Sequence, residues 1–247
     1  VSLGELMTKT QVTDIPDIVE EAGAVTPGGQ VILDVAAELF SDKGYDATSM
    51  REVACRAGMS KANVFHHFGS KHELYLEVIR EACRDSSEAL RQGQNEGDTV
   101  TEQLSAFLRH HLETLLRNEQ VSRLVVREVI NSSPEGGKEL AEQVFFEGFT
   151  ELVEIVREGQ VRGEFRPDMD PALLAQLIIS TNVFFFQSRN VMRHFPLVDF
   201  TDDPERFARM ASDLLFYGCL QNPTDNQRSL SGTGTVQEKS NGMKVHD

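Results

Sequence analysis

The chain has 247 residues, of which 40% are hydrophobic and 7% aromatic, and its formal net charge is −15. These values are typical of a water-soluble globular protein that is large enough for two units with separate cores. The sequence has no run of eighteen apolar residues and no secretory signal pattern, and its three cysteines, Cys55, Cys83 and Cys219, form no C-x-x-C pair. We therefore expect a cytoplasmic protein without membrane spans, disulfides or structural zinc, in which Cys55 is a small buried thiol.

The first elements are an acidic leader and one amphipathic helix. Residues 1–25 carry five acidic side chains and one lysine with little periodicity, which predicts a loose leader. Thr26-Pro27 favours a helix start, and Lys43-Gly44 favours its end. Between them lies an apolar stripe that we expect to face the next two helices, formed by Val31, Ile32, Val35, Ala36, Leu39 and Phe40.

The segment 49–71, SMREVACRAGMSKANVFHHFGSK, has the spacing of two short helices around a tight turn. Ser49 and Glu52 fit an S-x-x-E capping box, and Gly58 can adopt the left-handed conformation that ends a helix sharply. Ser60 can cap the second helix, whose buried side carries Val64 and Phe68. The opposite side offers Lys61, Asn63, His66 and His67, which can meet phosphates or base edges. This pattern predicts a DNA-reading helix-turn-helix, with an ordinary helical hairpin as the alternative.

The run DVAAELFSDKGYDATSMREVACRAGMSKANVFHHFGSKHELYLEVI resembles the N-terminal domain of the TetR/AcrR family of bacterial transcriptional regulators. The resemblance covers about residues 29–84. It implies a three-helix DNA-binding head, an all-α ligand domain and a homodimer, with Thr48 and Lys71 holding phosphates and the face from Ser60 to His67 entering the major groove. The expected DNA contacts are Thr48, Ser49, Arg51, Ser60, Lys61, Ala62, Asn63, His66, His67 and Lys71.

Two features depart from the family pattern. Pro27-Gly28-Gly29-Gln30 stands where many members carry basic residues, and His67 stands where tyrosine is frequent. Between Lys43 and His72, five basic residues oppose two acidic ones, which gives this segment a net charge of +3 on an acidic protein. We therefore expect salt-sensitive DNA binding without a basic arm.

The rest of the chain predicts an all-α fold in two domains. A fourth helix runs toward Leu90, and the turn GQNEGD at 93–98 marks a boundary. We assign residues 26–92 to a helix-turn-helix DNA-binding domain, 93–221 to a helical-bundle ligand-binding and dimerisation domain, and 222–247 to a disordered polar tail. Within the bundle, Asn131-Ser-Ser-Pro134 and Gly136-Gly137 are expected to end one helix.

The second domain offers candidates for a ligand pocket. Three adjacent aromatics, Phe184, Phe185 and Phe186, cover most of a helix circumference, so one of them must face a cavity or another protein. Arg127 is the candidate for an anionic ligand, whereas His111 fits a satisfied core histidine as well. The expected apolar or aromatic effector would meet a set of candidate residues, with a well-filled core as the alternative: Phe107, His111, Arg127, Phe145, Phe149, Phe185 and Phe186.

The sequence gives little support for metal binding or catalysis. No histidine has glutamate three positions before it, there is no H-E-x-x-H, and no nucleophile has a credible base nearby. We expect no catalytic residue, metal or cofactor. The predicted helices at 170–195 and 203–221 are apolar over wide arcs, which favours a homodimer through both.

The sequence therefore predicts a ligand-responsive repressor that binds a palindromic DNA operator as a homodimer. A protein that keeps this fold as an interaction module without DNA binding is the alternative, supported by the charge of −15 and the missing basic arm. A small-molecule effector would act through its different affinities for the two conformational states.

Overall fold

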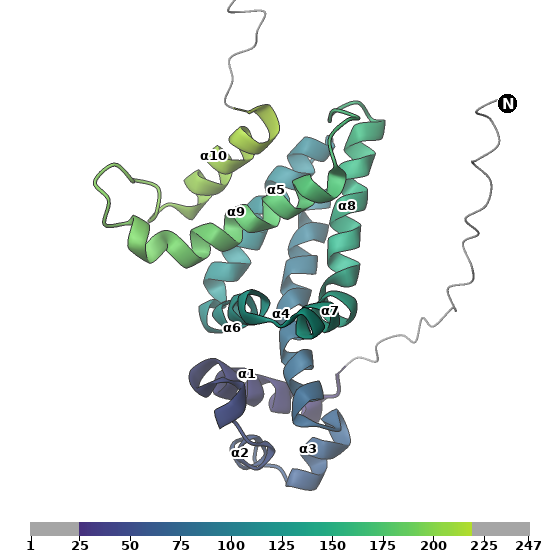
Figure 1. Cartoon of the computed structure of the whole chain (residues 1–247), viewed down its shortest axis with the longest axis vertical. Helices are drawn as coiled ribbons and strands as arrows, with labels where there is room; N and C mark the ends of the chain where they lie inside the picture. The colour runs from purple at the N-terminus through teal and green to yellow at the C-terminus, as the bar shows by residue number, and fades with distance from the viewer. Residues whose placement is uncertain (1–24, 219–247) are drawn as a thin grey trace, which may run out of the picture. The chain divides into compact units, whose positions relative to one another are not determined.

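The structure is a computed structural model that describes residues 25–218, and this part of the chain contains helices and no strand. The all-α prediction is confirmed (Figure 1). The predicted leader lies outside the described residues apart from Val25, and the predicted tail lies outside them entirely. The helices are α1 Pro27–Ala47, α2 Met50–Arg56, α3 Lys61–Phe68, α4 Lys71–Gln94, α5 Val100–Arg117, α6 Glu119–Asn131, α7 Pro134–Leu140, the π-helix η1 Ala141–Phe145, α8 Phe146–Val161, α9 Pro171–Met192 and α10 Pro204–Tyr217.

The chain divides into two compact units between Val78 and Ile79, within α4. The boundary that we expect near Gly93 from the turn signals lies at the C-terminal end of the same helix. A continuous helix therefore belongs to both units: its first two turns complete the core of the first unit, and its remainder belongs to the second.

The first unit is built on α1 to α3 and the start of α4. Thr26 caps α1 by accepting a hydrogen bond from Gly29, and the chain bends at Gly44, where φ is 81°. The predicted stop at Gly44 is therefore confirmed as a break in helical geometry. The core of this unit consists of Ile32, Leu33, Ala36, Leu39, Phe40, Val53, Ala54, Val64, Leu74, Tyr75 and Val78.

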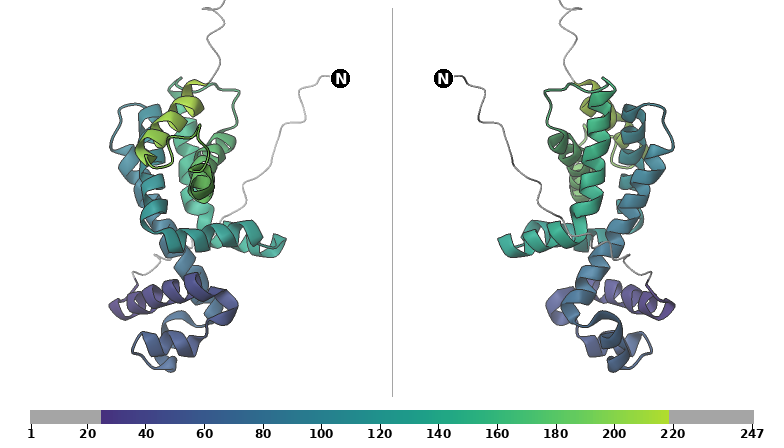
Figure 2. Two further views of the ribbon diagram at one scale, coloured as in Figure 1. Left: turned by 90° about the vertical axis from the view of Figure 1, so that its left-hand side faces the viewer. Right: turned by 90° about the vertical axis from the view of Figure 1, so that its right-hand side faces the viewer.

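The second unit packs α5 against α8, α9 and α10. Figures 1 and 2 show α5 and α8 running beside each other, with α6 and α7 lying across them at one end. Its core contains Leu104, Leu108, Leu112, Leu152, Val156, Ala175 and Ile178. Our expectation that Gly136-Gly137 ends a helix is wrong: both lie inside α7, because Ser133 caps a new helix that starts at Pro134.

Helix α9 is the only element within residues 25–218 that is long and apolar enough to cross a membrane by length and composition. It packs against α5 and α8 and buries Leu174, Ile178, Phe185 and Phe186 in the core of the second unit. A core helix passes the same test of length and composition. The contacts place one face of α9 in this core.

Candidate nucleic-acid interface

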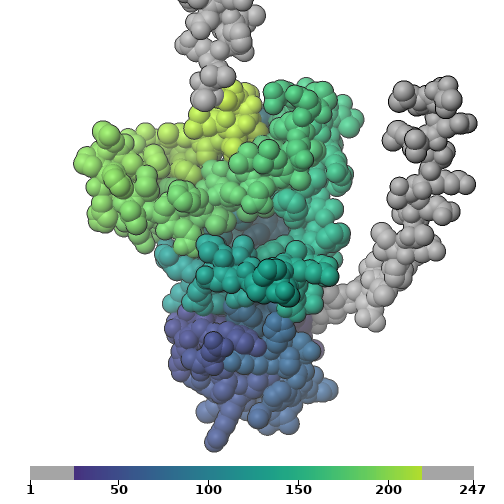
Figure 3. Space-filling view, in the orientation of Figure 1, coloured from purple at the N-terminus to yellow at the C-terminus, as the bar shows by residue number. Residues whose placement is uncertain are grey.

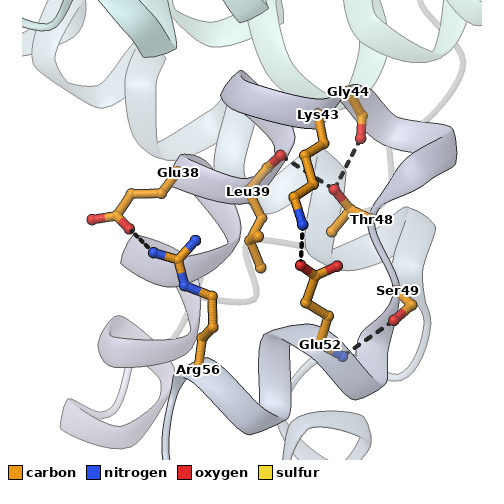
Figure 4. A network of polar contacts seen from close by, with 8 residues as sticks. All are labelled: Glu38, Leu39, Lys43, Gly44, Thr48, Ser49, Glu52 and Arg56. Carbon is orange, nitrogen blue, oxygen red and sulfur yellow. Dashed lines mark hydrogen bonds and ion pairs between the residues drawn. The ribbon is translucent and has the colours of Figure 1, made fainter.

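The first helix of the motif begins as the sequence predicts. Ser49 Oγ accepts a hydrogen bond from the amide of Glu52 at 3.1 Å, and Met50, Val53 and Ala54 are buried. The second half of the expected capping box is replaced, because the Glu52 carboxylate forms an ion pair with Lys43 (Figure 4). Glu52 thus ties α2 to α1.

The turn and the second helix also form as predicted. Gly58 has φ 66°, in the left-handed region where a side chain is strained, and the amide of Met59 bonds the carbonyl of Ala54 at 2.9 Å. Ser60 Oγ accepts from the amide of Asn63 at 3.1 Å and caps α3. The short turn and the two caps set α3 directly after α2, and Val64 is buried in the core of the unit.

The face of α3 away from the core carries polar side chains that the sequence predicts to contact DNA. Lys61, Asn63 and His66 are exposed, and His67 is half-buried. Gly28 at the start of α1 lies beside His67, since a Cβ added at Gly28 would lie 3.5 Å from His67 Nε2. Along α3, the predicted contacts Lys61, Asn63 and His66 are therefore accessible, and His67 is partly covered by the start of α1.

Phe65 is a surface residue that our sequence reasoning missed. Its side chain is 39% exposed, and Lys61 Nζ lies 5.4 Å from its ring centroid. A signal was available, because successive helix positions are about 100° apart and Val64 already takes the buried side of this short helix, which favours an outward Phe65. An exposed aromatic beside a lysine can make apolar contact with a thymine methyl group.

The expectation that Thr48 holds a phosphate is not supported by its geometry. Its side chain is 2% exposed, and its hydroxyl donates to the carbonyls of Gly44 at 2.9 Å and Leu39 at 3.2 Å (Figure 4). The single hydroxyl proton is shared between these two acceptors, so it is not available to a phosphate. We correct the role of Thr48 to closing the end of α1.

Lys71 remains a candidate for a phosphate contact. Its ammonium group donates to the carbonyl of Asp46 at 3.3 Å and lies 4.2 Å from the ring centroid of Tyr45. An ammonium group has three N–H donors, so this position leaves others for a phosphate oxygen. The Tyr45 ring holds the lysine in place by a cation–π contact.

Two of the basic side chains that give the head its positive charge are engaged in ion pairs with acidic residues. Lys43 is paired with Glu52, and Arg56 is paired with Glu38 at 3.1 Å (Figure 4). Arg51 and Lys61 are exposed on α2 and α3.

The thiol of Cys55 is also exposed, which corrects the expectation of a buried cysteine: on the short α2, Val53 and Ala54 face the core and Cys55 faces outward.

The predicted ligand residues of the second unit are spread over several environments. Phe107 and His111 are buried with their rings stacked at 5.4 Å, and Phe145 and Phe149 are half-buried. Arg127 is exposed on α6. Ligand binding by these residues stays a prediction. Figure 3 shows a hollow in the surface of this unit, bordered by α9 and by α6 and α7.

The three adjacent phenylalanines of α9 separate as their spacing requires. Phe185 and Phe186 are buried, and the Phe185 ring lies 3.9 Å from that of Phe207 in the core. Phe184 is 72% exposed. The third aromatic therefore faces outward, and its contact with another protein stays a prediction.

A buried polar pair escaped the sequence reasoning. Asn182 Nδ2 donates to the carbonyl of Leu108 at 2.7 Å and lies 3.1 Å from Nδ1 of His111. Burial lowers the pKa of His111 to about 4, because the charged imidazolium would lose its hydration. His111 is thus a neutral core residue with a polar partner.

Comparison with known proteins bears on both units. Residues 32–78 match the family model described as "Bacterial regulatory proteins, tetR family", and residues 101–214 match the model described as "Tetracyclin repressor-like, C-terminal domain". Among residues 25–218, no group of three His, Cys, Asp or Glu side chains is placed to hold a metal ion.

The chain is similar to curated and solved regulators. It is 30% identical over 159 residues to the HTH-type transcriptional repressor KstR2 of Rhodococcus jostii, covering 61% of this chain and 74% of that protein. The structure of PfmR from Thermus thermophilus matches with a TM-score of 0.57 and 28% identity, covering 77% of this chain and 99% of that one. The structure of FadR from Bacillus subtilis in complex with stearoyl-CoA matches with a TM-score of 0.66 and 20% identity, covering 77% of this chain and 99% of that one. This likeness shows a shared fold.

Proposed function

The chain belongs to the TetR family of bacterial regulatory proteins and is a DNA-binding regulator, and from this premise we propose that it is a homodimeric repressor of transcription that releases its operator when a small molecule binds. The observation that carries the proposal is the exposed face of α3. Helix α3 is capped by Ser60 and anchored by the buried Val64. It exposes Lys61, Asn63 and His66 on its surface. Such a face can enter the major groove while α2 crosses the backbone.

The second unit supplies the surface for dimerisation. Exposed apolar side chains form one stripe along α9 and a second on α10, and their spacings of three, four and seven residues place each set on one helix face. The stripes consist of Leu173, Leu177, Phe184 and Val191 on α9, and Met210, Leu214 and Tyr217 on α10. Exposed apolar stripes on two helices that contact each other are best covered by the same surface of a second copy.

A dimer gives the arrangement that DNA reading by such heads requires. Two copies of α3 related by a two-fold axis read the two halves of a palindrome, at a spacing near one turn of DNA. The missing basic residues at the start of α1 and the net charge of −15 make each single head a weak binder. Operator affinity then depends on linking two heads.

The effector site is proposed in the second unit. The half-buried Phe145 and Phe149 and the buried Phe107 and Phe186 supply an apolar aromatic environment on several helices. An amphiphile such as the stearoyl-CoA of the B. subtilis FadR complex combines an apolar chain with anionic groups and would suit such a site. Helix α4 belongs to both units, so a ligand that favours one state of the second unit can reach the heads through it.

The test is selection of genomic fragments by the full-length protein at low salt, followed by fluorescence anisotropy on the selected site. We expect one short palindromic sequence to be enriched and bound as a dimer. Failure to enrich any sequence would favour the alternative, an interaction protein that keeps the fold without reading DNA.

A further inference from the structure

On one edge of the Arg189 guanidinium group, on α9, only one of the two N–H donors has a hydrogen-bond partner among the described residues. Its Nη2 donates to Glu119 Oε1 at 3.0 Å, whereas its Nε is buried and has no hydrogen-bond partner among the described residues. Nε and Nη2 point their N–H groups in the same direction, and this edge matches two oxygens of one carboxylate or phosphate. Glu119 engages one donor of the pair and leaves the other without an acceptor.

A second arginine shares the same carboxylate. Arg123 on α6 places its Nη2 3.6 Å from Glu119 Oε2, and its guanidinium carbon lies 5.2 Å from the ring centroid of Phe186 on α9. Two guanidinium groups therefore surround one carboxylate, and the cluster carries an excess of one positive charge. A partly buried excess charge with an unused donor is stabilised by an additional anion.

The start of α6 adds to this potential. Asn118, the residue before the helix, makes no side-chain cap to the α6 amides, since its amide group bonds Asp85 at 2.8 Å. The amides at the start of α6 therefore carry the positive end of the helix dipole without a capping oxygen. Glu119 and Arg123 lie in the first turns of this helix.

The cluster lies where charged and apolar groups meet. Arg123 stands on α6 and Phe186 and Arg189 on α9, and these two helices border the surface hollow of the second unit (Figure 3). Phe186 is 1% exposed and stands three residues before Arg189, so both lie on nearly the same side of α9. A ligand with an oxyanion at Arg189 would have its adjoining apolar part beside Phe186.

We infer that Arg189 and Arg123 form the binding site for the oxyanion of an amphiphilic effector, whose apolar chain packs beside Phe186. This inference rests on the proposed function, because it names the class of molecule that acts on the second unit. The oxyanion takes the Nε and Nη2 edge of Arg189 and displaces the Glu119 carboxylate from that edge. A free carboxylate and a phosphate ester present the same chemistry to this edge.

The experiment measures binding of palmitate, palmitoyl-CoA and uncharged hexadecanol to the full-length protein by displacement of a fluorescent fatty acid. Arg189→Met keeps the length and apolar stem of the side chain and removes the charge. We expect it to weaken binding of the anionic ligand by about 10- to 100-fold while hexadecanol binds as before. Tighter binding of palmitate or of palmitoyl-CoA to the natural protein identifies the source of the oxyanion.

Two further variants make the test specific. Arg193→Met is the matched control, since Arg193 lies one turn after Arg189 and its guanidinium is engaged by Asp202 at 2.9 Å; its anion binding should not change. Glu119→Gln removes the competing carboxylate and should tighten binding of the anionic ligand several-fold without changing that of hexadecanol. A merely structural role for the cluster would not produce this gain.

The inference is overturned if Arg189→Met binds the anionic ligand as tightly as the natural protein does, if it loses hexadecanol to the same degree, or if no amphiphile binds. Operator binding measured without ligand keeps this result separate from the proposed function. A protein that binds its palindrome but no amphiphile refutes the effector site alone.

Discussion

The ammonium group of Lys71 lies over the ring of Tyr45, 4.2 Å from its centroid. The lysine at the start of α4 is thereby fixed against the end of α1, and the position of a candidate phosphate contact is set by packing inside the head. Lys61 differs, because it is exposed on α3 and its ammonium group lies farther, 5.4 Å, from the centroid of the Phe65 ring. The two lysines therefore have separable roles.

Replacing each lysine alone should distinguish these roles. Lys61→Ala should weaken operator binding with little effect on stability, and Lys71→Ala should weaken binding and also lower the free energy of unfolding by about 0.5–1 kcal/mol, since it removes the cation–π contact. Each change should reduce the slope of log affinity against log salt by about one. Anisotropy titrations between 50 and 200 mM salt, with urea unfolding of the same samples, would measure both effects. An unchanged salt slope in both variants would contradict DNA contact by either lysine.

Thr48 should act on stability and not on DNA contact. Thr48→Val removes the hydroxyl that bonds Leu39 and Gly44 and should destabilise the head by about 1–3 kcal/mol, because two carbonyls lose a buried donor. Operator affinity of the folded variant and its salt slope should remain those of the natural protein. Lost affinity at unchanged stability would restore the phosphate contact that the family resemblance implies.

The dimer prediction can be tested with one charge. Phe184→Glu places a carboxylate on the α9 stripe and should give a monomer by analytical ultracentrifugation, because a charge buried at the interface loses its hydration. The monomer should lose nearly all operator affinity. Val161→Glu is the matched control, since Val161 is 88% exposed on α8, outside the two stripes. A head that binds the site equally well as a monomer would refute the requirement for two linked heads.

His111 predicts acid sensitivity of the second unit. Its pKa is lowered from 6.5 to about 4 by burial, so between these values the unfolded chain binds a proton that the folded chain does not. Stability therefore falls as the pH drops from 6.5 toward 4, by about 2 kcal/mol between pH 7 and pH 5. His111→Phe should lose this part of the pH dependence in denaturant unfolding, whereas exposed His194 replaced by Phe should keep it. Equal pH dependence in both variants would show that His111 does not titrate in this range.

Features that depend on a few neighbouring residues could be read from the sequence. Ser49 and Ser60 cap their helices by bonds to amides three residues later, and Gly58 ends α2 by its own backbone conformation. These interactions are local, so their spacing along the chain already contains their geometry. The all-α class and the exposed polar face of α3 follow from the same short-range rules.

Features that depend on residues far apart needed the tertiary structure. The inward hydroxyl of Thr48, the outward thiol of Cys55 and the pairing of Glu52 with Lys43 depend on how α1 and α2 pack. The Arg189–Glu119 pair joins residues 70 positions apart. Helical periodicity states which residues share a face but not which face meets which partner, because that choice is made by packing of the whole unit. The sequence alone therefore predicted a helical DNA-binding regulator with a reading helix, and only the tertiary structure decided which of its polar side chains hold the protein together and which stay exposed.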